Sequence, residues 1–225
     1  MVLDLMTSGT HHLVSTMDLK KRSEIHWPRK LWHMSGVMAI AIGYSYVPHT
    51  VALSLLAFLW LLFVPADFMR LRNPAINDFL LTLFRPIMRE SERQRIAGTS
   101  FLITGVLLVA LIFPKEIVIL TLLFLAFADP MASYFGIKFG KDKIFGHKSL
   151  QGTLAAFFVC AILTFIFLYA HNMMMDRLIV VSLIGGLVGC LAELIPIADL
   201  DDNFTLPIMS AICLHLVFSL FGALA

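Results

Sequence analysis

Long apolar runs constrain this chain more than any other feature. Of its 225 residues, 59% are hydrophobic and 14% are charged, which is more apolar surface than one soluble domain of this size can bury. A helix needs roughly 17 to 25 mostly apolar residues to cross a hydrocarbon layer about 30 Å thick. We predict an all-α integral membrane protein, a bundle of about seven transmembrane helices. The predicted spans cover residues 31–48, 50–66, 96–113, 117–139, 153–170, 178–198 and 205–223.

The first 30 residues have a different character. They contain no apolar segment followed by a small-residue cleavage site, so we expect no signal peptide. Basic residues between Lys20 and Lys30 lie beside Trp27 and Trp32, a pattern typical of the headgroup region next to a membrane helix. We therefore divide the chain into an interfacial segment, residues 1–30, and a polytopic membrane domain, residues 31–225.

The distribution of basic residues predicts one orientation. Fifteen of the 17 lysines and arginines precede the first span, or lie between the second and third or the fourth and fifth spans. A seven-span topology places these segments on one side and leaves only Lys115 and Arg177 on the other. Because Lys and Arg favour the cytoplasmic side in short loops, we predict a cytoplasmic N-terminus and a C-terminus on the opposite side. Most charged groups at the membrane edge then face the cytoplasm, and we expect the active site there.

The three cysteines indicate neither a disulfide framework nor a zinc site. Cys160, Cys190 and Cys213 fall inside three different predicted spans, without CxxC or Cys/His spacing. We expect them to pack among apolar side chains.

A basic, glycine-containing patch, "GKDKIFGHKSLQG", occupies residues 140–152. Cations beside backbone that can approach a ligand closely suit a polyphosphate, and Ser149 stands where the next helix is expected to begin, with free N–H groups. Lysines that only meet anionic lipid are the alternative. A P-loop, which needs a preceding buried strand, is excluded, since His147 separates Gly146 from Lys148 and no strand is expected before them. The candidate nucleotide-binding residues are Lys143, Gly146, Lys148, Ser149 and Gly152.

Acidic residues at two other places are candidate metal ligands. Asp129 directly follows the apolar residues 117–128, and a carboxylate at that depth is costly unless it is paired, hydrated or bound to a cation. Asp201 and Asp202, next to Asn203, lie where the sixth span turns into the seventh. A turn that caps the last helix explains them equally well. However, no Lys or Arg follows Arg177 to neutralise them, which favours magnesium.

Four other charged residues have weaker claims to a function. Glu193 is expected to face the bundle interior, where an ion pair with an arginine near Arg89 is at least as plausible as catalysis. The same caution applies to Asp67. His33, one turn from the start of the first span, is more often a packing residue than a catalyst. Arg89 belongs to "RPIMRESER", residues 85–93, which is also explained as an interfacial helix with solvated charges.

Together these segments resemble the polytopic CTP-dependent lipid-alcohol kinases, which include dolichol kinase, phytol kinase and the fungal-type diacylglycerol kinase. The matching pieces occur in the family's order and cover most of the chain from residue 29 on. They are "RKLWH", "MRESE", "ADPMASYFGIKFGK", "GHKSLQGTLA" and "AELIPIADLDDNFTLPIMS". The chain departs from the family at Ala128, where many relatives carry Gly, and at Gln151, where many carry Glu. We therefore assign Gln151 no acid–base or metal role.

The resemblance implies transfer of the γ-phosphate of CTP to the hydroxyl of a membrane lipid alcohol such as a polyprenol, phytol or diacylglycerol. Lys148, Ser149 and the backbone at Gly146 would bind phosphates with help from Lys143. Asp129 and Asp202, with Asp201 as a third ligand, would hold Mg²⁺, unless Asp129 instead accepts the alcohol's proton. His33, Arg89, Glu193 and Asn203 would support the substrate or phosphates.

Two alternatives remain open at this stage. The "KSLQG" patch and the intramembrane acid also resemble phosphatidate cytidylyltransferase, which uses CTP and a membrane lipid. A small transporter or lipid-binding scaffold is disfavoured because the polar residues gather at one face and no pair of interrupted helices in matching halves is evident. The expected partners are a lipid alcohol and a nucleoside triphosphate, with no nucleic acid, and the oligomeric state is left open.

Overall fold

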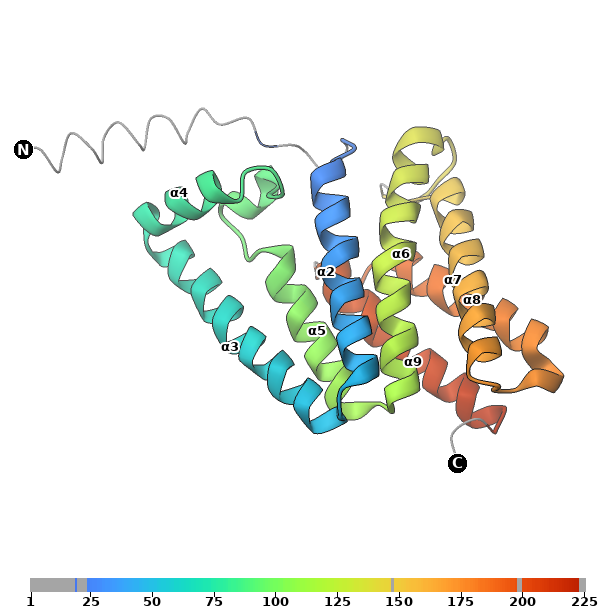
Figure 1. The fold of residues 1–225 in the computed structure, drawn as a ribbon. Coiled ribbons are helices and arrows are strands. Elements are labelled where there is room, and N and C mark those ends of the chain that lie inside the picture. Colours follow the sequence, from blue (N-terminus) through green and yellow to red (C-terminus); the bar gives the residue numbers. More distant parts are fainter. Residues whose placement is uncertain (1–18, 20–23, 147, 198–199, 223–225) are drawn as a thin grey trace, which may run out of the picture.

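A computed structural model describes residues 19, 24–146, 148–197 and 200–222, and within these ranges the chain is almost entirely helical (Figure 1). The predicted interfacial segment 1–30 lies largely outside the described residues, as do His147 and Asp199 from the two polar patches. The elements in chain order are α2 (Trp27–Tyr46), α3 (His49–Arg72), α4 (Pro74–Leu83), η1 (Glu90–Arg93), α5 (Gly98–Ile112), α6 (Lys115–Phe139), β1 (Lys143–Phe145), β2 (Lys148–Ser149), α7 (Leu150–Ala170), η2 (Met175–Arg177), α8 (Leu178–Leu194) and α9 (Asp202–Leu220).

The predicted class, an α-helical membrane protein, is confirmed. Each of the seven expected spans coincides with a helix, and among the described residues five helical segments are long and apolar enough to cross a membrane. The helices α2 and α5 are not among these five, and α5, with 15 residues, would rise only about 22 Å. Seven crossings and the orientation of the termini therefore stay predictions.

Two helix boundaries differ from the predicted ones. The first helix begins at Trp27 instead of residue 31, with Pro28 in its first turn, a position that a proline tolerates because its missing N–H has no helical partner there. The second helix does not stop at residue 66 but continues to Arg72. In its last turns Asp67 and Arg70 are buried, and the Asp67 carboxylate accepts a hydrogen bond from Nε of Arg70.

A small hairpin interrupts the helical pattern between α6 and α7. The strands β1 and β2 pair antiparallel, with Lys143 opposite Ser149. The expectation that no strand precedes Lys148 is therefore wrong in detail, but β1 is fully exposed and cannot supply the buried strand that a P-loop requires. The hairpin carries Lys148 to the edge of the bundle.

The core forms around α6, which packs against α2, α7 and α9, while α3 packs mainly on α5 (Figure 1). The helices α7 and α8 approach closely because Gly185 and Gly189 have no side chain there. A Cβ at Gly189 would lie 2.2 Å from Sγ of Cys160. Small residues at such contacts are typical of membrane helices. Cys160 and Cys190 are buried free thiols, which confirms their expected packing role.

Candidate active site

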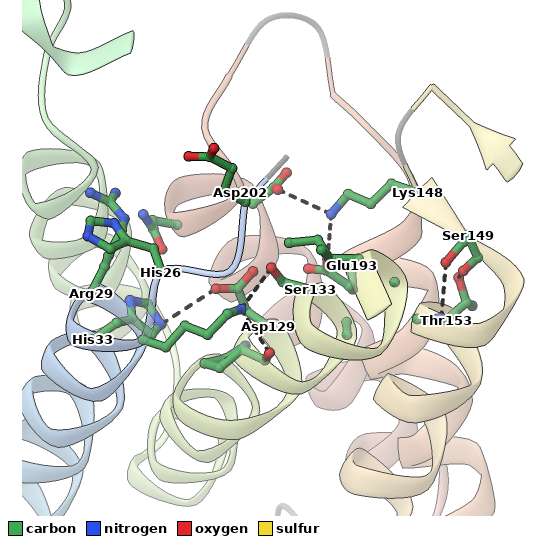
Figure 2. Close-up of a pocket in the computed structure, with 18 of the residues that line it drawn as sticks. His26, Arg29, His33, Asp129, Ser133, Lys148, Ser149, Thr153, Glu193 and Asp202 are labelled. Carbon is green, nitrogen blue, oxygen red and sulfur yellow. Dashed lines mark hydrogen bonds and ion pairs between the residues drawn. The ribbon is translucent and has the colours of Figure 1, made fainter. Parts of the chain in front are cut away.

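A cavity of about 530 Å³ opens at the end of the bundle where α2, α7 and α9 begin and α6 and α8 end (Figure 2). This volume is within the range of small-molecule sites. Basic side chains from three separate parts of the sequence line the cavity: Arg29 and Lys30, Arg89, and Lys143 and Lys148. Three carboxylates face them across the same space. The cavity therefore joins the basic and the acidic patches noted in the sequence.

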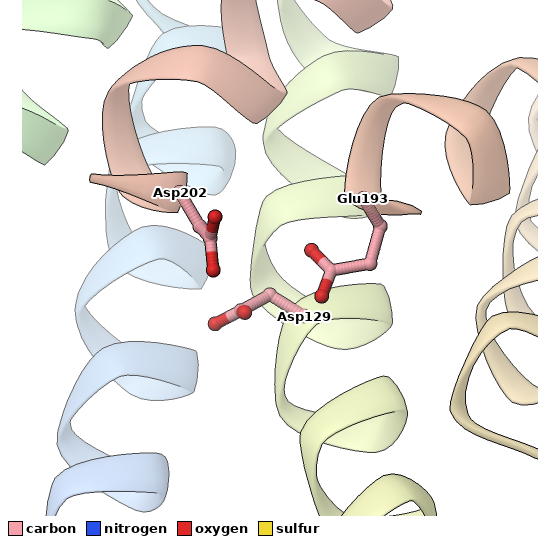
Figure 3. A group of neighbouring side chains, drawn as sticks. All are labelled: Asp129, Glu193 and Asp202. Carbon is pink, nitrogen blue, oxygen red and sulfur yellow. The ribbon is translucent and has the colours of Figure 1, made fainter. Parts of the chain in front are cut away.

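The three carboxylates are those of Asp129, Glu193 and Asp202, which we call the carboxylate cluster (Figure 3). One oxygen atom from each residue lies within 4.8 Å of the other two. The residues are supplied by α6, by the last turn of α8 and by the first turn of α9. Oε2 of Glu193 is buried and has no hydrogen-bond partner among the described residues. This geometry suits a divalent cation, which binds carboxylate oxygens from several elements at once.

Lys148 lies directly on the carboxylate cluster. Its Nζ donates hydrogen bonds to Oε1 of Glu193, at 2.5 Å, and to Oδ2 of Asp202, at 3.1 Å (Figure 2). Burial lowers the pKa of Lys148, but the neighbouring carboxylates of Glu193, Asp202 and Asp129 outweigh it and raise the pKa above its ordinary value. These carboxylates therefore favour the charged form of the side chain. Glu193 pairs with this lysine, and not with an arginine near Arg89.

Two basic side chains of α2 lie beside Asp129. Nε2 of His33 is 3.8 Å from Oδ2 of Asp129 and 2.9 Å from the carbonyl oxygen of Leu125. Because a carbonyl can only accept, Nε2 carries the ring proton. Nζ of Lys30 donates to the carbonyl of Pro130 and to Oγ of Ser133. The sequence had placed Lys30 at the lipid headgroups, whereas it lines the cavity.

The remaining residues of the acidic turn have local roles. Oδ1 of Asp201 accepts a hydrogen bond from the backbone N–H of Asn203 and caps α9. Asp201 lines the cavity but is not part of the carboxylate cluster, where Glu193 stands in the place expected for it. Nδ2 of Asn203 donates to the carbonyl of Gly98 and joins α9 to α5.

The basic patch is arranged partly as expected. Ser149 caps α7, as predicted, with its Oγ accepting from the N–H of Gly152. Lys143, Ser149 and Gly152 line the cavity, whereas Gly146 is not among its lining residues. Gly146 adopts a positive φ of 53°, the conformation that glycine tolerates best. Its place in the hairpin turn accounts for this glycine.

The glycines of the patch also have a packing function that the sequence did not reveal. A Cβ at Gly152 would lie 2.7 Å from the carbonyl oxygen of Ala132 on α6. Gly136 faces Gly152 across the same contact. These two glycines let α6 and α7 meet near the cavity, so close helix contact explains them without a bound phosphate. Gln151 donates to Oδ2 of Asp142, just before β1, and its lack of a chemical role stays a prediction.

A buried polar network supports the cavity from the side of α3 and α5. Arg29 forms a two-pronged ion pair with Glu92, and Glu92 also accepts from the N–H groups of Arg89 and Gly98. Burial raises the pKa of Glu92, but Arg29 and these N–H groups outweigh it and hold the pKa below its ordinary value. Residues 85–93 are thus more than a solvated interfacial helix. Glu92 ties this loop to α2.

Asp67 belongs to the same side of the molecule. Its Oδ2 accepts from the N–H of Ala97 and from Oγ of Ser100, while Arg70 also donates to the carbonyls of Glu92 and Arg95. The structural explanation for Asp67, an ion pair, is confirmed. It holds the loop that carries Arg89 and Glu92.

We expect Asp67→Asn to lower the apparent melting temperature in detergent by roughly 10 °C. Removing one partner of a buried pair costs about 3–5 kcal/mol, and each kcal/mol shifts the midpoint by about 2–4 °C in a chain of this size. The matched control is Glu90→Gln, which breaks an exposed pair of the same spacing, with Arg93, and should change the midpoint by less than about 2 °C. Equal shifts for the two variants would contradict the structural role of Asp67.

The sequence missed two lining residues that helical spacing could have found. Ser133 follows Asp129 at i+4 and so shares its helix face. Lys30 precedes His33 by three residues and shares a face with it in the same way. Both relationships depend on α6 and α2 being helical through these positions, whereas the sequence placed the start of the first span after Lys30.

Comparison with curated proteins identifies the family. Over 88% of its length, this chain is 34% identical to CTP-dependent diacylglycerol kinase 1 of Schizosaccharomyces pombe, of which it covers 94%. The chain belongs to the family of CTP-dependent diacylglycerol kinases. It is also similar to two proteins of the same name. The one from Eremothecium gossypii is 33% identical over 85% of this chain and 67% of that protein. The one from Saccharomyces cerevisiae is 27% identical over 86% of this chain and 74% of that protein.

This membership confirms the resemblance drawn from the motifs and the expected class of enzyme, a lipid kinase. A cytidylyltransferase or a transporter is not favoured by these relatives. No family model matches the chain, and no solved structure matches it.

Proposed function

We propose that this protein transfers the γ-phosphate of CTP to the hydroxyl of a membrane lipid alcohol, with diacylglycerol as the first candidate. The convergence of Lys148 with Asp129, Glu193 and Asp202 at one cavity carries the proposal. The names of the relatives supply the nucleotide and the lipid. Residues 31–225 would form one polytopic catalytic domain, with α2 extending it back to Trp27.

The carboxylate cluster fits a magnesium ion. Three carboxylates are present, and Oε2 of Glu193 is a buried acceptor that lacks a donor among the described groups. Asp129, Glu193 and Asp202 would hold Mg²⁺, which neutralises charge on the phosphates and on the transferring phosphoryl group when bound. Glu193 replaces Asp201 in this set, because Asp201 caps α9 instead of joining the cluster.

The basic side of the cavity would bind the triphosphate. Phosphoryl transfer needs alignment and charge neutralisation more than covalent participation by the protein. We assign Lys148, supported by Lys143, to the phosphates, with Arg89 and Lys30 as further cations lining the cavity. The backbone at the start of α7, capped by Ser149, adds the positive end of a helix dipole.

The lipid hydroxyl would enter beside Asp129. Its oxygen attacks the γ-phosphorus, the bond from that phosphorus to the bridging oxygen breaks, and CDP leaves. The hydroxyl proton then needs an acceptor near the attacking oxygen. Nε2 of His33 already carries a proton, which it donates to Leu125. Nε2 is also the ring nitrogen that lies toward Asp129, so we assign the acceptor role to Asp129, alongside its role as a metal ligand, and His33 positions its carboxylate.

The cavity opens at the end of the bundle that carries most of the basic loops, and we propose that this end is cytoplasmic. Arg89, Lys143 and Lys148 line the cavity, whereas Lys115 and Arg177 lie at the opposite helix ends. A cytoplasmic cavity would meet soluble CTP while remaining open to lipid.

The test supplies CTP labelled separately at the α- and γ-phosphates to purified protein in vesicles that contain diacylglycerol or a polyprenol. We expect γ-label in phosphatidate and no α-label in any lipid. Transfer of γ-label only to the polyprenol would support the kinase activity but would make the polyprenol, and not diacylglycerol, the acceptor. Incorporation of α-label would mean cytidylyl transfer and would overturn the proposal, as would the absence of label from all lipids.

A further inference from the structure

Lys148 contacts two of the three carboxylates that a metal ion would need. Its Nζ lies between Glu193 and Asp202, the lysine side chain is 14% exposed, and the Glu193 side chain is 5% exposed. Two of the three members of the carboxylate cluster thus already share one cation of the protein itself (Figure 2). In this arrangement the cluster already holds a cation, the ammonium group of a lysine.

We propose that Lys148 is an internal counter-ion that keeps divalent cations off the carboxylate cluster until the nucleotide binds. This inference rests on the proposed function and concerns the order of events at the same site. An ammonium group and a divalent cation on the same carboxylates repel each other strongly at such short range. Removal of the ammonium would in turn leave buried carboxylates uncompensated, which is costly. The cluster therefore holds one cation or the other.

The elements around the site explain why the lysine is the partner that moves. Asp129, Glu193 and Asp202 project from three helices that pack into the bundle. Lys148 projects from the hairpin, next to the exposed strand β1. A lysine side chain is a flexible four-carbon stem with a single charged end. It can turn from the carboxylates to a phosphate without movement of the helices.

A triphosphate would provide that second partner for the ammonium group. It brings several negative charges into a cavity lined by Lys143 and Arg89 as well as Lys148, and charge-assisted hydrogen bonds to phosphate are strong. Once Lys148 turns to the phosphates, its ammonium group no longer competes with a metal ion for the carboxylates. Bound nucleotide then increases the affinity of the protein for the metal ion, and bound metal increases its affinity for the nucleotide, because thermodynamic coupling between two sites is reciprocal. The enzyme without nucleotide would bind metal poorly.

The experiment measures Mn²⁺ binding to the full chain in detergent without nucleotide, from the loss of the free Mn²⁺ electron paramagnetic resonance signal. We expect weak binding by the wild type and by Lys148→Arg, which keeps the positive charge. Lys148→Met should bind Mn²⁺ at least about tenfold more tightly, since it removes a like charge at close range. The added change Glu193→Gln in Lys148→Met should abolish this gain and so locate the ion at the cluster.

The matched control is Lys141→Met, which removes the same charge from an exposed position on the same connection and should change Mn²⁺ affinity less than about twofold. Unchanged or weaker binding by Lys148→Met would overturn the inference. So would tight Mn²⁺ binding by the wild type without nucleotide, a result that does not depend on whether any variant folds. These readouts involve no turnover, so their failure is distinct from a failure to transfer γ-label from CTP.

Discussion

Asp129→Asn is expected to reduce lipid phosphorylation by about three orders of magnitude, because the substitution removes both a metal ligand and the proposed acceptor of the hydroxyl proton. General-base catalysis contributes roughly 10²–10⁴-fold in rate, and the loss of a ligand adds to this. The amide is nearly the same size as the carboxylate, so packing around α6 should survive. The measurement is γ-label transfer from CTP to diacylglycerol by protein that stays monodisperse in detergent.

The matched control for this variant is Asp176→Asn. Asp176 is an exposed aspartate paired with Arg177 at the far end of the bundle, and its loss should leave the rate within about twofold of the wild type. If Asp129→Asn kept more than about a tenth of the wild-type rate, Asp129 would have neither of its proposed roles.

Glu193→Gln is expected to lower the rate by about two orders of magnitude or more, whereas Asp201→Asn should lower it less than about tenfold. The two substitutions separate the ligand set suggested by the sequence from the set that the structure brings together. Glu193 contacts Lys148 within the carboxylate cluster. Asp201 caps α9, and Asn caps a helix about as well as Asp.

The dependence of the rate on magnesium concentration provides a further measurement on these variants. Loss of one ligand should shift the magnesium dependence of Glu193→Gln to higher concentrations, while that of Asp201→Asn stays near the wild type. The reverse order of severity between the two variants would return Asp201 to the metal site and would assign Glu193 a structural ion pair with Lys148.

The helices could be predicted from the sequence because hydrocarbon thickness dictates the length of apolar runs. The boundaries near charged residues could not, since Asp67 and Arg70 are tolerated inside α3 through contacts with each other and with Asn77, and above all through contacts with residues 92–100. Those partners lie about 20 to 30 residues away in the chain. No local pattern reveals them.

The candidate site could be predicted from the sequence only in part. Asp129, Lys148 and Asp202 stand out in the sequence because a charge next to an apolar run is costly without a partner. Glu193 was noticed, but its partner was not, because the choice between Lys148 and an arginine near Arg89 depends on how α8 packs beside the hairpin. Lys30 was assigned to the lipid headgroups, although α2 directs it to Ser133.

The origin of the carboxylate cluster in three different helices has a consequence for biosynthesis. The last of the three residues, Asp202, is the first residue of α9. A nascent chain that has inserted only the helices up to α8 would hold Asp129 and Glu193 without their third member. Catalytic activity would then appear only after the acidic turn has been translated and α9 has packed against the other helices. Truncated chains released by stalled ribosomes would therefore not consume nucleotide in the membrane.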